Sequence, residues 1–345
     1  IGASCFGYLA LQQGETVSAM YLVVAAVCIY MIAYRFYGRF VAYKVLELDK
    51  NRATPAMVND DGRDFVPTNK SVLFGHHFAA IAGAGPLVGP ILAAQMGYLP
   101  SMLWILVGGV FAGAVHDFVV LFISSRRNGK SLGEIIKEEL GTFVGGVTMI
   151  AIFGIMLIII AILSMVVVKA LAESPWGLFT IAMTIPIAIF MGIYMRYLRP
   201  GKVGEASVIG FILLILAIHY GSIIAADPYW KQVFTFDATT LAFIMMAYGF
   251  IAAVLPVWFL LAPRDYLSTF LKIGVIVLMA IAIVIVAPDI QMPKMNTQYF
   301  DGSGPVFAGA IFPFLFITIA CGAISGFHAL ISSGTSPKML ENETH

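Results

Sequence analysis

Long apolar stretches decide what this chain can fold into. An apolar helix of about 20 residues spans the hydrocarbon core of a bilayer, so stretches of that length predict transmembrane helices. Only 11% of the residues are charged, whereas soluble domains carry about 25%, so lipid is the solvent expected for most of the chain. We predict spans at 18–36, 74–98, 101–124, 145–170, 177–197, 206–226, 240–261, 266–287 and 307–333.

Two further segments complete the predicted organisation. The opening letters IGASCFGYLAL resemble the second half of another apolar span, so we expect a clipped membrane helix there. The segment 131–141 carries apolar residues at helical spacing beside Glu134, Lys137, Glu138 and Glu139, which fits a short amphipathic helix on the membrane surface. A solvated connector fits that segment equally well.

The charges of the connections set the orientation. All but three of the twenty Lys and Arg residues lie on one set of alternating connections or on the adjoining helix ends, and the exceptions are Lys169, Lys231 and Lys294. Cytoplasmic loops of membrane proteins carry this excess of positive charge. We therefore expect the end of this chain, after the span 307–333, to lie in the cytoplasm.

The segment 75–90 contains helix breakers in the middle of a predicted span. Its sequence is GHHFAAIAGAGPLVGP, and proline costs a helix interior about 3 kcal/mol and glycine about 1. Backbone groups in lipid must be satisfied inside the protein, so such a break is expected where the backbone lines a cavity. We predict a non-helical segment over Gly83–Pro90. The alternative is a continuous glycine-rich helix that packs closely on its neighbours.

The predicted break also suggests a binding site for an anion. A helix that resumes near Gly89–Ile91 would expose N–H groups and about half a positive charge. No Lys or Arg lies near the middle of any predicted span, so a carboxylate would use this helix end. The hydroxyl-rich segment 319–334 could contribute Ser325, although close helix packing explains most of its small residues. The predicted substrate-binding residues are Gly83, Gly85, Pro86, Gly89 and Ser325.

A second break is expected five spans later. The span 240–261 crosses in the opposite direction and contains Gly249 and Pro256, so we predict a kink over Gly249–Pro256. Paired breaks of this kind occur in transporters built from inverted repeats. We expect an all-α polytopic bundle with three parts: 1–73 as a clipped span, peripheral helix and loop, 74–226 as a first five-helix repeat, and 240–345 as a partial second repeat.

Ionisable side chains inside spans are candidates for function. His116, Asp117 and His328 lie at similar depths towards the cytoplasmic side, and a histidine near a carboxylate suits proton coupling. The alternative is a structural hydrogen bond between a histidine and the backbone.

Four residues at cytoplasmic span ends are candidates for gating. His76 and His77 precede the predicted break, and Arg264 and Asp265 could form an ion pair at the end of the second broken span. Arg264 is also explained by the charge rule alone. Neighbouring helical residues point about 100° apart, and no HExxH or Cys/His set is present, so no metal site is expected.

Long blocks of the sequence resemble the carbon starvation protein A (CstA) family. They include VLFGHHFAAIAGAGPLVGPILAAQMGYLP, SPWG, YLRPG, VLPVWFLLAPRDYLSTFLKIG and FPFLFITIACGAISGFHALISSGTSPKML. The resemblance implies a bacterial inner-membrane transporter of the APC superfamily with a LeuT-type inverted repeat. It implies uptake of peptides or pyruvate during nutrient limitation, and it implies that pyruvate uptake is coupled to proton entry. Family chains are about twice this length, so the second repeat is incomplete here.

Two functions therefore compete. The first is a proton-coupled importer of small nutrients, and the second is a nutrient-responsive sensor or channel-like protein without coupled transport. No nucleotide-binding motif or nucleophile–base pair is visible, so we expect neither an enzyme nor a cofactor other than the coupling proton. The expected partners are the lipid bilayer and a small-molecule substrate, with a homo-oligomer left open and no nucleic acid.

Overall fold

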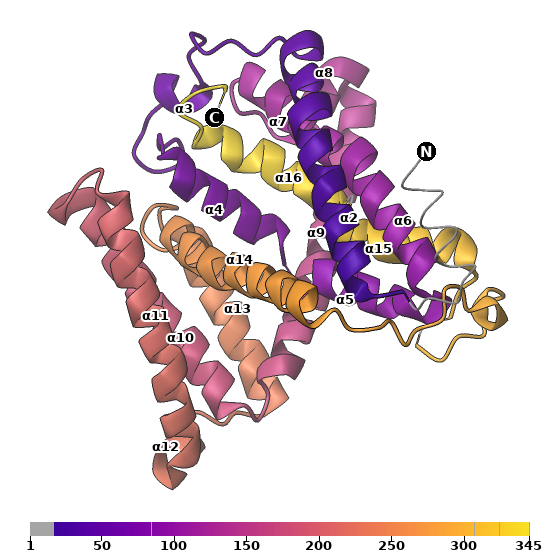
Figure 1. The fold of residues 1–345 in the computed structure, drawn as a ribbon. Coiled ribbons are helices and arrows are strands. Elements are labelled where there is room, and N and C mark those ends of the chain that lie inside the picture. The colour runs from indigo at the N-terminus through magenta and orange to yellow at the C-terminus, as the bar shows by residue number, and fades with distance from the viewer. Residues whose placement is uncertain (1–16, 84, 307, 324, 345) are drawn as a thin grey trace. The chain divides into compact units, whose positions relative to one another are not determined.

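Regular structure throughout the described residues is helical. The computed structural model describes residues 17–83, 85–306, 308–323 and 325–344 (Figure 1). The clipped helix expected at 1–11 lies outside these residues. The described chain is an all-α polytopic membrane protein, as predicted.

Six helices are long and apolar enough to cross a membrane among the described residues, and they confirm six of the nine predicted spans. Several begin or end in π-helical turns. They comprise α2 (Ala19–Ile32) extended to Val45, α6 (Tyr98–Gly108) continued through Gly109–Gly113 into α7 (Ala114–Arg126), α9 (Thr142–Leu171), α10 (Pro175–Ile193) extended to Leu198, α11 (Val203–Ala226), and α14 (Leu261–Val286).

The other three predicted spans are shorter or interrupted, and they are the three in which the sequence predicted irregularity. The first is divided into α4 (Lys70–Ile81) and α5 (Gly85–Ala93). The second is α13 (Ala238–Val254), with 17 residues. The third is divided into α15 (Phe316–Ala323) and α16 (Gly326–Gly334). Glycine or proline lies at or next to each of these interruptions, although α10 continues past Pro186.

The interruption between α4 and α5 exists, but the predicted position was wrong. Ala82 ends α4 with φ −83° and ψ 56°, and the helix resumes at Gly85 rather than near Gly89–Ile91. Pro86 is the second helical residue, where its missing N–H would have had no helical acceptor. Pro90 lies inside α5. A proline near a helix start is therefore compatible with helix, which the prediction of a break over Gly83–Pro90 did not consider.

The predicted kink within 240–261 was also misplaced. α13 runs without interruption past Gly249 and ends at Val254, where Leu255 is extended. Pro256 lies in the short connection to α14, which begins at Leu261, ahead of the predicted start at 266. A proline cannot donate a helical hydrogen bond, and it disfavours helical geometry in the preceding residue. The irregularity is therefore a helix end instead of a kink.

The predicted amphipathic helix is confirmed as α8 (Leu132–Leu140). Ser131 and Glu134 form a capping box at its start. The hydrogen bonds from the backbone N–H and hydroxyl of Ser131 hold the pKa of Glu134 below its usual range. α8 packs closely on α9, because a Cβ on Gly145 would lie 2.5 Å from Lys137 Cα. α3 (Pro55–Val58) and α12 (Pro228–Val233) are short helices. Turns of 3-10 helix are formed by Ala94–Met96, Thr297–Tyr299 and Ser336–Lys338.

The chain forms two compact units. The first comprises Ile1–Leu48, Pro86–His116 and Ile273–Gly326. Its core brings together Ala93, Met96, Leu315 and Ile319. Trp104 on α6 packs edge-on against Phe316 on α15, with ring centroids 5.0 Å apart.

The second unit comprises Asp49–Gly85, Asp117–Lys272 and Phe327–His345. α10 and α11 lie side by side in it (Figure 1), and their buried Met191 and Leu214 pack with Leu267 of α14. The outer faces are apolar, as on α9, where Ile150, Phe153 and Ile158 are largely exposed. Such faces are expected to contact lipid.

Candidate functional site

A histidine and a carboxylate meet in the second unit. His328 Nδ1 on α16 lies 3.0 Å from Asp117 Oδ2 on α7. The side chains are 9% and 17% exposed, respectively. Of the three residues predicted for proton coupling, the structure therefore pairs two. His116 precedes Asp117 on the same helix and takes no part in this hydrogen bond.

Serine hydroxyls fix α16 where His328 can reach Asp117. Ser124 on α7 donates its hydroxyl to the backbone carbonyl of Ser333 on α16 at 3.0 Å. The backbone N–H of Leu132 donates to the Ser333 hydroxyl at 3.2 Å. Ser124 and Ser333 are almost completely buried. Ser333 thus joins α16 to α7, whereas a Cβ on Gly326 or Gly334 would meet nothing within 4 Å, so close packing does not explain these two glycines.

The two histidines of α4 lie beside this pair. His76 Nδ1 is 2.9 Å from Asp265 Oδ2 on α14, although it is not aligned for a hydrogen bond. His77 Nδ1 is 2.6 Å from the Ser336 hydroxyl. His77 also interacts electrostatically with Asp117, His76 and His328. Three histidines and two carboxylates predicted in separate roles therefore form one cluster, which we call the histidine cluster (His76, His77, Asp117, Asp265 and His328).

The expected ion pair between Arg264 and Asp265 was wrong. Asp265 faces His76, whereas the Arg264 guanidinium lies over the Tyr248 ring, 5.0 Å from its centroid. Consecutive residues on a helix point about 100° apart, so their side chains cannot easily pair with each other. The sequence identified Asp265 as a candidate but could not show which helix it would face.

A lysine that the sequence analysis did not select lies at the end of α4. Lys272 Nζ donates to the carbonyl of Ala79 at 2.7 Å. Carbonyls in the last turn of a helix lack helical donors, and a cation there is favourable. Lys272 is near the middle of the 26-residue α14, so the prediction that no cation lies near the middle of a span was wrong. The signal was a single lysine a few residues inside the predicted span 266–287.

The predicted substrate-binding residues have different surroundings. A Cβ on Gly83 would meet nothing within 4 Å, whereas a Cβ on Gly89 would lie 2.5 Å from the carbonyl oxygen of Thr318. Gly89 therefore allows α5 to approach α15, which is the close-packing alternative. Gly85 and Pro86 form the start of α5, and Ser325 is buried just before α16.

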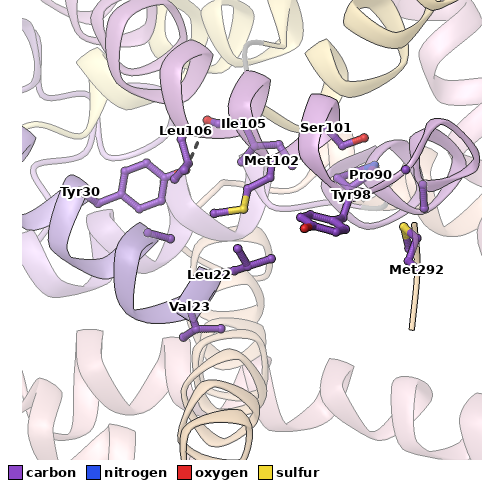
Figure 2. A pocket seen from close by; sticks show the side chains of 13 residues that line it. Leu22, Val23, Tyr30, Pro90, Tyr98, Ser101, Met102, Ile105, Leu106 and Met292 are labelled. Carbon is purple, nitrogen blue, oxygen red and sulfur yellow. Dashed lines mark hydrogen bonds between the residues drawn. The ribbon is translucent and has the colours of Figure 1, made fainter. Parts of the chain in front are cut away.

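An apolar pocket lies elsewhere, in the first unit. It has a volume of about 390 Å³ and is bordered by α2, α5 and α6 (Figure 2). Two of its hydroxyls are occupied: Tyr30 donates to Ile105 O at 3.3 Å, and Ser101 donates to Ala93 O at the same distance. A charged substrate would lose its hydration there without gaining partners. The pocket is therefore a poor candidate for a carboxylate site.

The histidine cluster combines imidazole and carboxylate groups. Within the described ranges, no three His, Cys, Asp or Glu side chains are arranged to hold a metal ion. Imidazole changes its charge between pH 5 and 8, and a neighbouring carboxylate stabilises the charged form. In the pair of His328 and Asp117, an imidazole lies within hydrogen-bonding distance of a carboxylate.

Comparisons with known proteins agree with the resemblance seen in the sequence. The family described as "Carbon starvation protein CstA" matches residues 18–345. The chain is 86% identical over its whole length to the peptide transporter CstA of Campylobacter jejuni, of which it covers 49%. It is 64% identical to the pyruvate/proton symporter BtsT of Escherichia coli, with the whole chain aligned to 48% of that protein.

A further relative is the peptide transporter CstA of Escherichia coli, at 62% identity over 99% of this chain and 49% of that protein. The chain thus spans about half the length of the relatives it matches. No solved structure matches. These names are those of transporters, in agreement with the prediction that the chain is not an enzyme.

Proposed function

Because the chain belongs to the carbon starvation protein CstA family, we propose that it is part of a secondary transporter that imports small nutrients with protons. The observation that carries this proposal is the buried pair of His328 and Asp117. Ionisable side chains inside membrane proteins are costly and mark ion or proton pathways. Relatives named as transporters, one of them a pyruvate/proton symporter, support the same function.

The proposed mechanism assigns different tasks to the histidine cluster. His328 and Asp117 carry the coupling proton. His76 and Asp265 link α4 to α14 and act as a gate, and His77 connects the cluster to Ser336. A change in the charge of one member alters the energy of the others, because like charges repel and opposite charges attract at short range. Protonation can thereby alter the contact between α4 and α14.

The proposed substrate is pyruvate or a short peptide. Relatives with each name are more than 60% identical to this chain, so overall identity does not discriminate between them. Both substrates carry a carboxylate, and a peptide also needs a partner for its amino group. A carboxylate is therefore the shared chemistry that the site has to recognise.

We also propose the arrangement of the helices in the membrane. The interrupted pair of α4 and α5 and the short α13 belong to corresponding positions of a LeuT-type inverted repeat, with 74–226 as the first repeat and 240–345 as part of the second. The protein lies in the bacterial inner membrane, with residue 344 on the cytoplasmic side. The lysine and arginine distribution supports this orientation. A structure of the full-length protein tests the inverted repeat. Labelling of a cysteine at position 344 with a reagent that does not cross the membrane tests the orientation.

Transport is tested with the purified full-length protein in lipid vesicles. We expect uptake of labelled pyruvate or labelled dialanine to rise with an inward proton gradient. A protonophore should abolish the increase, because it removes the gradient without touching the substrate. Vesicles without protein are the control. Uptake that is unchanged by the gradient would contradict proton coupling, and the absence of any uptake would favour the sensor.

The alternative of a nutrient sensor without transport is less well supported. The relatives carry the names of transporters, and a sensor would not require a proton-accepting pair in the membrane. We therefore do not favour it.

A further inference from the structure

We propose that His328 binds the substrate carboxylate through Nε2 at the first turn of α16, so that proton and carboxylate share one imidazole. This inference rests on the proposed transport function and deepens it, because it names the group that recognises the substrate. It also moves the expected anion site from α5 to α16.

The first observation is an unpartnered nitrogen. His328 Nε2 is buried without a hydrogen-bond partner, while Nδ1 of the same ring faces Asp117. The side chain is only 9% exposed. Leaving a buried donor or acceptor unsatisfied costs about 1–3 kcal/mol, so buried polar groups normally have a partner. A ligand that pairs with Nε2 would recover this cost.

The second observation is the position of His328 on its helix. α16 begins at Gly326, so His328 lies in the first turn. Side chains tilt back towards the N-terminus of a helix, where the positive end of the dipole attracts anions. The neighbouring turn adds Ser332, four residues later on the same face, whose buried hydroxyl also has no partner. A carboxylate has two oxygens, so it could accept one hydrogen bond from each of these two groups.

The hydrogen bond to Asp117 determines when the site can bind an anion. If Nδ1 donates to Asp117, neutral imidazole has a lone pair on Nε2, which repels a carboxylate. Addition of a proton gives Nε2 an N–H that can donate to the carboxylate. The proton enters as the substrate binds, and both leave when the imidazole returns to its neutral form. No covalent bond to the substrate forms or breaks.

The surrounding charges support this sequence of events. The positive end of α16 disfavours a lone imidazolium, whereas Asp117 and an incoming carboxylate both favour it. His77 on α4 interacts electrostatically with His328 and with His76, and Asp265 of α14 lies against His76. Proton binding and carboxylate binding at one imidazole must therefore strengthen each other to the same extent.

Two substitutions separate the nitrogens of the ring. His328→Asn places an amide close to the position of Nδ1 and leaves nothing at Nε2. His328→Gln places an amide nitrogen close to Nε2 without a charge. His219→Asn on the exposed side of α11 is the matched histidine control. Binding of labelled pyruvate to the full-length protein is measured between about pH 5.5 and 8, with neutral pyruvamide as competitor, and dialanine is compared with its C-terminal amide.

We expect wild type and His219→Asn to bind the acid more tightly as the pH falls and about tenfold more tightly than the amide. His328→Asn should lose about tenfold or more in affinity for the acid, together with the pH dependence and the preference over the amide. His328→Gln should retain part of the affinity without pH dependence.

The inference would be overturned if His328→Asn bound the acid with an affinity within about threefold of wild type and if this affinity still rose as the pH fell. Gel filtration and thermal unfolding report whether each variant folds. If His328→Asn does not fold, a wild-type pH dependence in His328→Gln overturns the inference on its own. Normal proton-driven uptake by His328→Asn contradicts the inference and the assignment of the coupling proton to His328, but it leaves proton-coupled import standing. A wild type that neither binds nor imports the acids contradicts proton-coupled import as well.

Discussion

Arg126 and Glu343 show how a pair of single residues holds the segment around residue 343 in place. Arg126 Nε and Nη2 donate to the two carboxylate oxygens of Glu343 at 2.7 and 3.1 Å. The backbone N–H of Asp49 donates to the same carboxylate at 2.8 Å. Burial acts to raise the pKa of Glu343, but these hydrogen bonds and the charges of Arg126 and Arg52 outweigh it, so the pKa is lowered.

The lowered pKa predicts how the stability of the second unit depends on pH. A carboxyl whose folded pKa lies below its unfolded value stabilises the fold above the unfolded pKa of about 4.3. The contribution is lost as the pH falls through the folded pKa. We expect Glu343→Gln to lower the free energy of unfolding by about 3 kcal/mol near neutral pH, because Arg126 loses its buried partner. The difference from wild type should shrink below about pH 4.

Thermal unfolding of the detergent-purified protein measures this difference. Glu139→Gln is the control, because its pair with Arg127 is exposed and salt bridges at the surface contribute little. If Glu343→Gln had wild-type stability at neutral pH, the pair of Arg126 and Glu343 would not hold the segment around residue 343.

The interrupted span is stabilised at the end of α4 by contacts with α14. Its last carbonyls have no helical donors, and Lys272 supplies one to Ala79. Thr269 donates its hydroxyl to the carbonyl of Gly75 at 2.7 Å. A Cβ on Gly75 would lie 2.5 Å from the ring of Tyr266, so α4 and α14 are in close contact. α14 therefore compensates for the loss of backbone hydrogen bonds at the break.

Replacement of Lys272 tests this compensation. Lys272→Met keeps the length of the side chain and removes the donor, so the last turn of α4 should open more often. We expect hydrogen exchange of the Ala82 amide, which bonds to Phe78, to become about tenfold faster. Lys272→Arg should retain most of the protection, and Lys231→Met on the exposed α12 is the control. Unchanged exchange in Lys272→Met would mean that the turn is held by other contacts.

The same elements show how far sequence reasoning could reach. The three irregular spans were predicted because glycine, proline and small residues are local signals. The position of the break was not, because Pro86 is equally compatible with a loop and with the first turn of α5. Asp117 and His328 were predicted from their charge and depth alone.

The contacts between residues of different helices could not be predicted in the same way. The contacts of His76 with Asp265 and of Lys272 with Ala79 depend on how α4 crosses α14, and no local pattern specifies that crossing. Gly89 was expected to face a substrate, but it contacts the backbone of α15. A glycine in a membrane helix has the same sequence signal in both cases.

At the level of the whole molecule, the proposed proton site and the proposed carboxylate site share the histidine cluster. Coupling in a symporter requires that the binding of one ligand changes the affinity for the other. A shared imidazole provides that link without a long-range rearrangement, and Asp117 maintains its orientation. We therefore expect protons to enter with the substrate, and we expect Asp117 to be required for this.

Proton entry during substrate uptake shows whether Asp117 couples the two. The full-length protein is placed in lipid vesicles that contain a pH-sensitive dye, and pyruvate or dialanine is added outside. We predict that the wild type acidifies the interior as substrate enters. Asp117→Asn should fold normally and lose this acidification, whether or not residual substrate entry persists. Asp301→Asn, in an exposed loop, should behave as wild type. Acidification by Asp117→Asn at the wild-type rate would contradict the account.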